Sequence, residues 1–177
     1  YVPIMTGCNK FCTYCAVPYT RGREISRPSE NILTEIKDLL DKGYKEIVLL
    51  GQNVNSYGLD KIKQGETELN FPELLTKIDS LADHFWIKYL TSHPYDMSDA
   101  LIEVMLNGKN INPYLHLPVQ AGADSMLQKM NRHYSIDSYK KLIYKIKAAM
   151  PELAISTDVI VGFSGETETE FQATKEL

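Results

Sequence analysis

The chain has 177 residues, of which 44% are hydrophobic and 24% charged, so it is long enough for one domain with a hydrophobic core. Its formal net charge of −4 excludes a global positive field, so nucleic-acid binding would need a local basic surface or a further domain. The apolar runs are too short to span a membrane, and no signal peptide is visible. Three cysteines in one loop argue against a secreted disulfide framework, and we expect a cytoplasmic protein.

Five apolar runs along the chain have the length and composition of β-strands. The run from Ile47 to Leu50 is rich in leucine and β-branched residues, which is typical of a strand buried in a parallel sheet. Residues 51–70 form a long polar loop in this prediction. The predicted strands cover residues 2–5, 46–50, 86–90, 114–117 and 155–161.

Apolar residues at helical spacing predict helices between and after these strands. Ser29 is a candidate N-cap for the first helix, and Gly43 provides its stop. Ser98 caps a later helix, and Thr167 with Glu170 forms a capping box for the last one. The apolar faces of the predicted helices that precede the last one fall within residues 32–40, 71–81, 101–105, 126–130 and 139–146.

The alternation of strands and helices predicts an α/β fold, in which a parallel sheet carries its helices on the outside. Right-handed crossovers wind such units in one direction, and five of them make a partial (β/α) barrel because a closed barrel takes eight. We see no internal repeat or linker, so we treat residues 1–177 as one domain. The abrupt start and the end within a helix lead us to expect a piece of a larger protein, truncated after about five βα units.

Each predicted strand is followed by a cluster of residues that packing alone would not choose. Because the carboxyl ends of parallel strands share one rim, the clusters together predict one site for a sizeable polar ligand. Turn formation could explain any one cluster, since Gly, Asn and Pro are turn residues, but it is a poor explanation for all of them. The clusters are residues 7–15, 51–53, 92–94, 118–122 and 162–166.

The cluster after the first strand contains all three cysteines, Cys8, Cys12 and Cys15. Three thiolates so close together can bind one metal centre and leave one position for another ligand. An iron–sulfur cluster is the favoured reading, while a zinc site and a redox pair of Cys12 and Cys15 stay open. The four histidines are scattered, and we expect His116 to be buried and hydrogen-bonded and His84 to lie on the surface.

The cysteine spacing, with Tyr14 directly before the last cysteine, resembles that of the radical S-adenosylmethionine (SAM) enzymes. Within that superfamily the chain is similar to the methylthiotransferases, and most similar to the branch that modifies N6-isopentenyladenosine beside the anticodon of tRNA. Related branches act on threonylcarbamoyl-adenosine in tRNA or on a ribosomal protein. Ser164 departs from the pattern, since the family usually has proline there. The resemblance runs end to end and is carried by residues 7–22, 26–28, 49–55, 117–120 and 161–167.

The resemblance implies a [4Fe–4S] cluster on Cys8, Cys12 and Cys15, with SAM bound at the fourth iron and cleaved to a 5′-deoxyadenosyl radical. The radical would take hydrogen from the adenine ring before sulfur and a methyl group are installed. Relatives also carry an N-terminal domain with a second cluster and a C-terminal RNA-binding domain, both absent from this chain. We therefore expect a cluster and SAM to bind here, but not full activity. The resemblance also implies an electron donor such as flavodoxin or ferredoxin, and it implies no membrane partner.

Polar residues near the strand ends are the candidates for contacts with SAM. Tyr14 would pack on or hydrogen-bond the adenine, and Gly51 would let the backbone approach the methionine end. Asp158 is the most telling candidate, because an unpaired carboxylate inside an apolar strand is costly. Each of these residues could instead anchor or cap a loop. The predicted SAM-binding residues are Tyr14, Gly51, Gln52, Asn53, Ser92, Gln120, Asp158 and Gly162.

A basic stretch beside the cysteines, Arg21, Arg23 and Arg27, is a candidate for holding phosphates of a tRNA anticodon stem-loop. Such charges are more often only solvated. Two other classes of function stay open: a non-catalytic iron–sulfur module for electron transfer or RNA docking, and a zinc-stabilised α/β domain. Iron uptake with SAM cleavage, iron uptake alone, and zinc uptake would distinguish the three.

Overall fold

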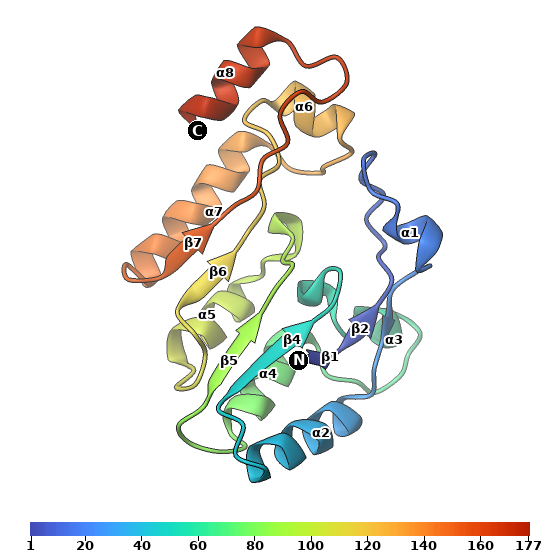
Figure 1. The fold of residues 1–177 in the computed structure, drawn as a ribbon, viewed down its shortest axis with the longest axis vertical. Coiled ribbons are helices and arrows are strands. Elements are labelled where there is room, and N and C mark those ends of the chain that lie inside the picture. Colours follow the sequence, from blue (N-terminus) through green and yellow to red (C-terminus); the bar gives the residue numbers. More distant parts are fainter.

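Seven short strands and eight α-helices follow one another along the chain, and the structure, a computed structural model, describes residues 1–177 (Figure 1). The strands are β1 (Val2–Pro3), β2 (Met5–Thr6), β3 (Ile25–Ser26), β4 (Glu46–Leu50), β5 (Trp86–Tyr89), β6 (Tyr114–His116) and β7 (Ala154–Ser156). The helices are α1 (Val17–Thr20), α2 (Ser29–Asp41), α3 (Leu59–Lys63), α4 (Phe71–Asp79), α5 (Asp99–Asn107), α6 (Asp124–Lys129), α7 (Ile136–Ala149) and α8 (Glu168–Glu176), with two 3₁₀ turns, η1 (Val54–Ser56) and η2 (Pro94–Asp96).

The parallel strands form part of a barrel that is not closed. β1, β4 and β5 are hydrogen-bonded in that order, and β6 pairs in parallel with β7. A single parallel bridge between Ile87 and Ile111 links the two groups of strands. The predicted α/β class, with parallel strands and helices around them, is therefore confirmed. No helix in the structure has both the length and the apolar character needed to cross a membrane.

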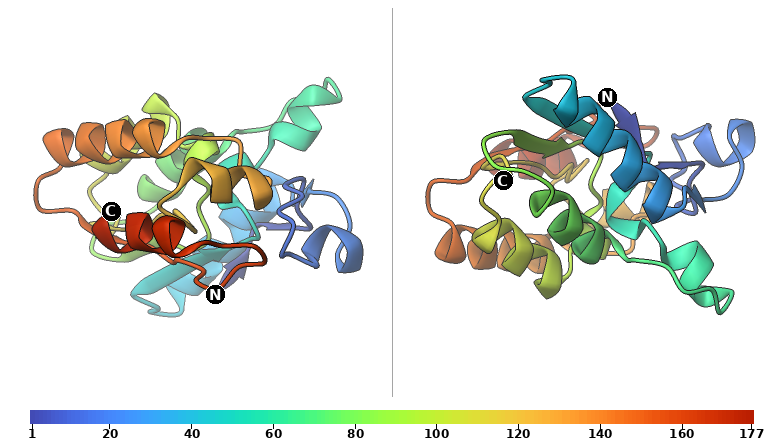
Figure 2. Two further views of the ribbon diagram at one scale, coloured as in Figure 1. Left: turned by 90° about the horizontal axis from the view of Figure 1, so that it is seen from above. Right: turned by 90° about the horizontal axis from the view of Figure 1, so that it is seen from below.

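The main core lies between the sheet and the helices α2, α4, α5 and α7. Figure 2 shows these helices on the outside of the strands. Ile47, Leu49 and Ile87 on the strands are at most 1% exposed, so truncating any of them to alanine would cost about 2–5 kcal/mol. Helix α4 begins with a capping box, in which the Asn70 side chain accepts from the Glu73 N–H and the Glu73 carboxylate accepts from the Asn70 N–H. The core thus holds the strand ends, and the loops that follow them, in fixed positions.

The predicted helix ends are confirmed except at Ser29. The Ser29 cap is wrong: Pro28 occupies the N-cap position of α2, and the Ser29 N–H donates to the Glu68 carboxylate instead. Gly43 does end this helix, with a φ of 88° that suits glycine in the left-handed region. The caps of Ser98 on α5 and of Thr167 with Glu170 on α8 are confirmed, since both depend on neighbours only three residues away.

Three predicted segments are more complicated in the structure than in the sequence pattern. Residues 2–5 are divided into β1 and β2, because β2 turns away to pair antiparallel with β3. Residues 155–161 contribute only β7 and one bridge between Val159 and Gln120. Residues 51–70 are not simply a polar loop, since they contain η1 and α3 and fully bury Val54 and Tyr57.

Candidate functional site

One pocket at the carboxyl ends of the strands contains all three cysteines. Its walls come from the cysteine loop, from the ends of β4, β5 and β6, and from the turn between α6 and α7. Segments far apart in the sequence therefore meet at one rim, as predicted for four of the five clusters, whereas residues 162–166 do not line this pocket. The lining residues are Cys8, Lys10, Cys12, Tyr14, Cys15, Gln52, Asn53, Thr91, Ser92, His93, Pro118, Gln120 and Arg132.

The cysteine loop is folded by its own backbone. Gly7 has a φ of 73°, and a Cβ there would lie 2.0 Å from the Arg23 carbonyl oxygen, so only glycine lets the loop close on this segment. The Cys8 N–H donates to the Gly22 carbonyl at 3.1 Å, and the Cys15 N–H donates to the Cys12 carbonyl at 3.0 Å. Cys8 and Cys12 are buried and Cys15 is half-buried. The loop thus closes between the paired strands β2 and β3, with the Cys8 and Cys12 thiols buried.

Two opposing effects act on the pKa of the Cys8 thiol. Burial raises the pKa of its thiol, while a hydrogen bond from the Lys10 backbone N–H, 3.4 Å from Sγ, opposes that effect. The buried Glu24 lies behind the loop, where its carboxylate accepts from the Asn9 backbone and side chain, and burial raises its pKa too. A thiol of this kind becomes a thiolate most readily when metal binding compensates for its desolvation.

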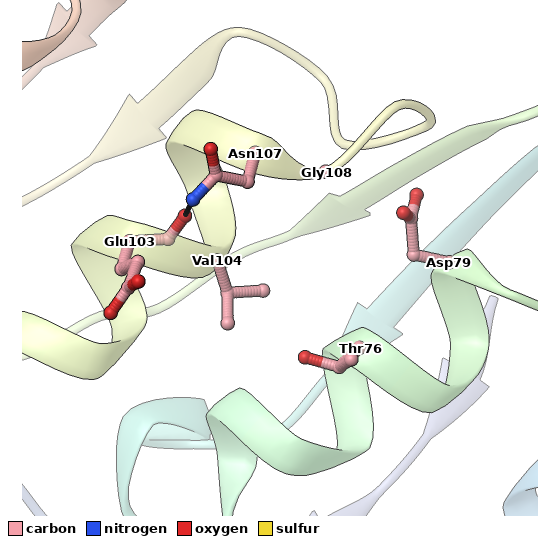
Figure 3. A pocket seen from close by; sticks show the side chains of 6 residues that line it. All are labelled: Thr76, Asp79, Glu103, Val104, Asn107 and Gly108. Atoms are coloured by element: carbon pink, nitrogen blue, oxygen red, sulfur yellow. Dashed lines mark hydrogen bonds between the residues drawn. The ribbon is translucent and has the colours of Figure 1, made fainter.

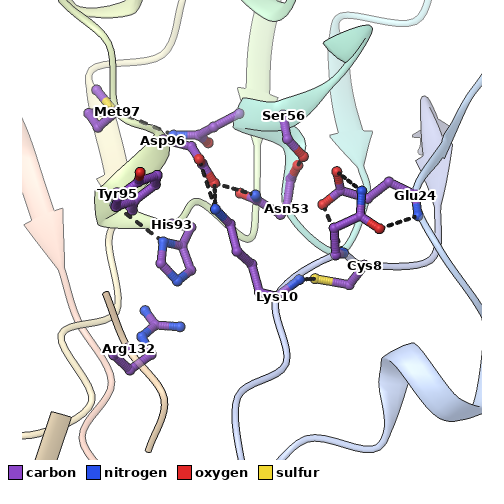
Figure 4. Close-up of polar contacts among 12 residues, drawn as sticks. Cys8, Lys10, Glu24, Asn53, Ser56, His93, Tyr95, Asp96, Met97 and Arg132 are labelled. Carbon is purple, nitrogen blue, oxygen red and sulfur yellow. Dashed lines mark hydrogen bonds and ion pairs between the residues drawn. The ribbon is translucent and has the colours of Figure 1, made fainter. Parts of the chain in front are cut away.

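A polar network joins the cysteine loop to two other rim segments (Figure 4). The Lys10 ammonium, between the first two cysteines, lies 2.9 Å from both carboxylate oxygens of Asp96 in η2. Asp96 also accepts from the Asn53 amide, at 2.6 Å, in the segment after β4. One carboxylate therefore joins two of the five predicted clusters, residues 7–15 and 51–53, to the turn that follows residues 92–94.

Two residues of the pocket have strained backbones. Thr91 has a φ of 72° and Gln120 a φ of 75°, values that β-branched and other non-glycine residues rarely adopt. The surroundings impose them: the Thr91 carbonyl accepts from the Val54 N–H, and the Gln120 N–H and carbonyl bond to Asp158 and Ile160. Strain of this kind clusters at binding sites, because only a rigid surround maintains it.

Several buried polar groups in the pocket have no partner within the chain. Asn53 Oδ1 and Ser92 Oγ are buried without a hydrogen bond. His93 Nδ1 accepts from the Tyr95 N–H at 3.2 Å, which leaves its proton on Nε2. Burial, with Arg132 and Lys10 nearby, lowers the pKa of His93 to about 2, so the imidazole is neutral. Unpartnered buried groups are costly, and a polar ligand would satisfy them.

Comparison with known families identifies the site. The family model of the Radical SAM superfamily matches residues 2–177, nearly the whole chain. The chain belongs to the radical SAM superfamily. The resemblance noted from the cysteine spacing is therefore confirmed, and the pocket that contains Cys8, Cys12 and Cys15 is the site where this superfamily's chemistry is to be sought.

Relatives within the superfamily share one description. The tRNA-2-methylthio-N(6)-dimethylallyladenosine synthase of Treponema denticola is 53% identical over 182 residues, and those of a Thermoanaerobacter species and Clostridium botulinum are 51% and 50% identical over 177. Each covers 100% of this chain, while the chain spans only 40%, 37% and 38% of these relatives. The chain is thus a radical SAM core related to methylthiotransferases.

Solved radical SAM structures share the fold at low identity. The cobalamin-dependent SAM radical enzyme OxsB matches 99% of this chain with a TM-score of 0.76 at 11% identity, over 25% of its own length. The radical SAM methyltransferase TsrM from Kitasatospora setae matches 99% with a TM-score of 0.73 at 16% identity, over 32% of its length. These likenesses support the partial barrel and say nothing further about chemistry.

The lining of the radical SAM pocket suits an iron–sulfur cluster. A [4Fe–4S] cluster takes each thiolate on a different iron, and Cys8, Cys12 and Cys15 all line this one pocket. The unpartnered oxygens of Asn53 and Ser92 face the same space and suit a polar cofactor beside the cluster.

The structure gathers five of the eight predicted SAM-binding residues in this pocket: Tyr14, Gln52, Asn53, Ser92 and Gln120. Gly51 directly precedes the lining residue Gln52 but does not itself line the pocket. A Cβ at Gly51 would be 2.6 Å from Met5 Cγ, so internal packing is one reason for glycine at this position. Gly162 lies in an exposed turn with a φ of 71°.

Asp158 is not the unpaired carboxylate within a strand that the sequence predicted. This residue lies beyond the end of β7, its carboxylate is 66% exposed, and it pairs with His116 Nε2 at 3.1 Å. It is therefore neither buried nor unpaired. His116 also bonds Ser156 Oγ at 2.7 Å, so its predicted hydrogen bonding is confirmed, although it is half-buried rather than buried. His84 is exposed, as predicted.

The pocket also contains residues that were not predicted. His93 belonged to a recognised cluster, but its buried neutral state depends on the fold. The position of Lys10 between two cysteines could have indicated that it lies in the pocket. No sequence signal indicated Arg132, since it lies in an ordinary polar turn between two helices.

A second cleft lies between α4 and α5, on the outside of the barrel (Figure 3). Its one carboxylate on α4, Asp79, accepts from the backbone N–H groups of Lys109 and Asn110 at 3.2 and 2.8 Å. This carboxylate serves to hold the turn after α5. The cleft contains no cysteine or histidine, so we place no chemistry there.

Proposed function

We propose that this chain is the SAM-cleaving core of a tRNA methylthiotransferase that acts on N6-isopentenyladenosine next to the anticodon. The observation that carries the proposal is the gathering of Cys8, Cys12 and Cys15 with unpartnered polar groups in one pocket. Identity of 50–53% along the whole chain to synthases of that description supports this branch over those for threonylcarbamoyl-adenosine or a ribosomal protein. Because the chain spans at most 40% of these relatives, the complete reaction belongs to the proposal.

Cys8, Cys12 and Cys15 would hold a [4Fe–4S] cluster. When bound, such a cluster supplies an iron with an open position and the electron that cleaves SAM to a 5′-deoxyadenosyl radical. The chain's own part is to keep the thiols in place. The Cys15 N–H donates to the Cys12 carbonyl, and the Lys10 N–H donates to Cys8 Sγ, which supports this role. A second cluster that provides sulfur would lie in a domain outside this chain.

SAM would bind along the opposite wall of the pocket. Asn53 Oδ1 accepts hydrogen bonds, and Ser92 Oγ can donate or accept, so both suit the amino, carboxylate or ribose groups of SAM. The neutral His93 offers an Nε2–H donor. Gln120 is held by its strained backbone and presents an amide at the strand end. Tyr14, at the pocket mouth, would pack on the adenine.

The tRNA would meet the outer side of the cysteine loop. The Arg23 guanidinium lies 4.5 Å from the Phe11 ring centroid, and Phe11 packs edge-to-face on Tyr19 at 5.8 Å. Tyr19 is 78% exposed. Aromatic rings beside arginines are the surface on which unstacked RNA bases and phosphates bind. Arg27 is already engaged by Glu35 at 2.7 Å, so we centre the proposed RNA contact on the two other arginines, Arg21 and Arg23.

Anaerobic reconstitution tests the proposal. We expect four irons per chain and production of 5′-deoxyadenosine from SAM under dithionite, both lost in Cys12→Ser. The matched control is Tyr19→Ala, which should keep iron and SAM cleavage but weaken tRNA binding. Four irons without SAM cleavage would indicate a non-catalytic iron–sulfur module, and one zinc per chain a structural domain. Methylthiolated tRNA made by residues 1–177 alone would refute the assignment of sulfur delivery to another domain.

A further inference from the structure

A buried arginine beside the cysteines has no carboxylate partner. Arg132, in the turn between α6 and α7, is only 7% exposed and is the one buried Lys or Arg in the chain. It takes part in none of the ten ion pairs. Its Nε donates to the Tyr134 hydroxyl at 3.0 Å and its Nη2 to the Pro118 carbonyl at 3.1 Å, both uncharged acceptors. A buried cation without a carboxylate partner is costly, so this site suits an anion of another kind.

The third nitrogen of this guanidinium is directed at a cysteine. Arg132 Nη1 lies 3.5 Å from Cys12 Sγ. Such a hydrogen bond is weak to a neutral thiol and becomes charge-assisted when the sulfur is a thiolate. The other cation of the pocket, Lys10, is already neutralised by Asp96 at 2.9 Å (Figure 4). Arg132 therefore carries the one uncompensated positive charge among the residues that line the pocket.

The position of this arginine is fixed from several sides. The Asn131 amide donates to the Phe11 carbonyl at 2.7 Å, and the Thr13 N–H donates to the Met130 carbonyl at 3.2 Å, which fasten the turn to the cysteine loop. The guanidinium also lies 5.1 Å from the Tyr134 ring centroid, and the Tyr134 hydroxyl donates to the Val119 carbonyl at 2.8 Å. The donor is thus preorganised toward Cys12 rather than mobile.

We propose that Arg132 is the counter-charge of the Cys12 thiolate and sets the reduction potential of a cluster bound there. The inference rests on the proposed function, since it requires a cluster on these cysteines. One-electron reduction by an external donor makes the cluster more negative. A positive charge and an N–H donor at a ligand sulfur stabilise that reduced state more than the oxidised one. Arg132 therefore makes the cluster easier to reduce, and acts as a positioning residue for its ligand.

Redox titration of the reconstituted protein, followed by electron paramagnetic resonance, tests this role. Arg132→Gln keeps a hydrogen-bond donor and removes the charge, and we expect a midpoint potential at least 59 mV more negative, a tenfold change in the one-electron equilibrium constant. Arg132→Lys keeps the positive charge but loses the planar guanidinium. Its midpoint potential should lie between those of the wild type and Arg132→Gln. The control is Lys141→Gln, which removes an exposed positive charge that does not line the pocket. Its potential should match the wild type.

The outcomes separate a redox role from a structural one. Equal potentials in wild type and Arg132→Gln at equal iron content would overturn the proposal. If Arg132→Gln takes up no iron, Arg132→Lys decides, because a loaded cluster at the wild-type potential refutes the role and a lower potential supports it. A wild type that takes up four irons without cleaving SAM would refute the proposed function alone, since the redox titration needs no SAM.

Discussion

The ion pair between Lys10 and Asp96 provides the sharpest test of how the pocket is assembled. Lys10→Met removes the ammonium but keeps most of the apolar stem. Asp96, whose side chain is 12% exposed, would then keep only the hydrogen bond from Asn53. A nearly buried carboxylate without its cation is costly, and the cysteine loop would lose its tie to η2.

The magnitude follows from the burial of the pair. An exposed pair contributes about 0–1 kcal/mol, and breaking a fully buried one costs about 3–5 kcal/mol. The side chains of Lys10 and Asp96 are 21% and 12% exposed, so we expect Lys10→Met to lower the free energy of unfolding by about 2 kcal/mol. Adding Asp96→Asn removes the unpaired charge and keeps an acceptor for Asn53. The double variant should therefore recover about 1 kcal/mol of that loss.

Urea unfolding of the cluster-free protein measures these free energies, and iron retention after reconstitution reports on the loop. A matched control is Lys141→Met, which removes an exposed pair with Asp137 and should leave both readouts unchanged. Strictly additive effects of Lys10→Met and Asp96→Asn would refute the coupling. So would a Lys10→Met protein with wild-type stability and iron content.

Three further predictions concern stability. The hydrogen bond from the Ser125 hydroxyl, together with the capping bonds from Thr167, lowers the pKa of Glu170 to about 2, from an unfolded value near 4.5. Glu170 therefore stabilises the fold above pH 4.5, and this contribution is lost as the pH falls toward 2. Thermal unfolding of Glu170→Gln should show a smaller pH dependence over that window. Gly51→Ala should lower the free energy of unfolding by about 1–3 kcal/mol, and Met5→Ala should restore part of it if packing is the cause, which a cost unaffected by Met5→Ala would contradict. Thr91→Gly should raise the free energy of unfolding by about 1 kcal/mol by relieving the positive φ, and a loss of stability would show that the threonine side chain outweighs the strain.

Much of the fold was predictable because it depends on short-range patterns. The bounds of β4 agree with the predicted run of residues 46–50, since a buried parallel strand is apolar throughout. The capping box of Thr167 and Glu170 needs only residues three apart. The Ser29 cap failed because Glu68, 39 residues away, satisfies its backbone instead. The predicted strand bounds were wrong where pairing with another strand sets them, as when β2 leaves the parallel sheet to pair with β3.

The candidate site divides in the same way. The spacing of Cys8, Cys12 and Cys15 is a local property, and by itself it indicated three thiols in one loop and the superfamily to which the chain belongs. What surrounds the thiols was decided by the tertiary structure alone. Arg132 reaches Cys12 from 120 residues away and Asp96 reaches Lys10 from 86 residues away. Such contacts depend on the register of the strands and the packing of the helices, which place distant loops at one rim and which no local pattern encodes.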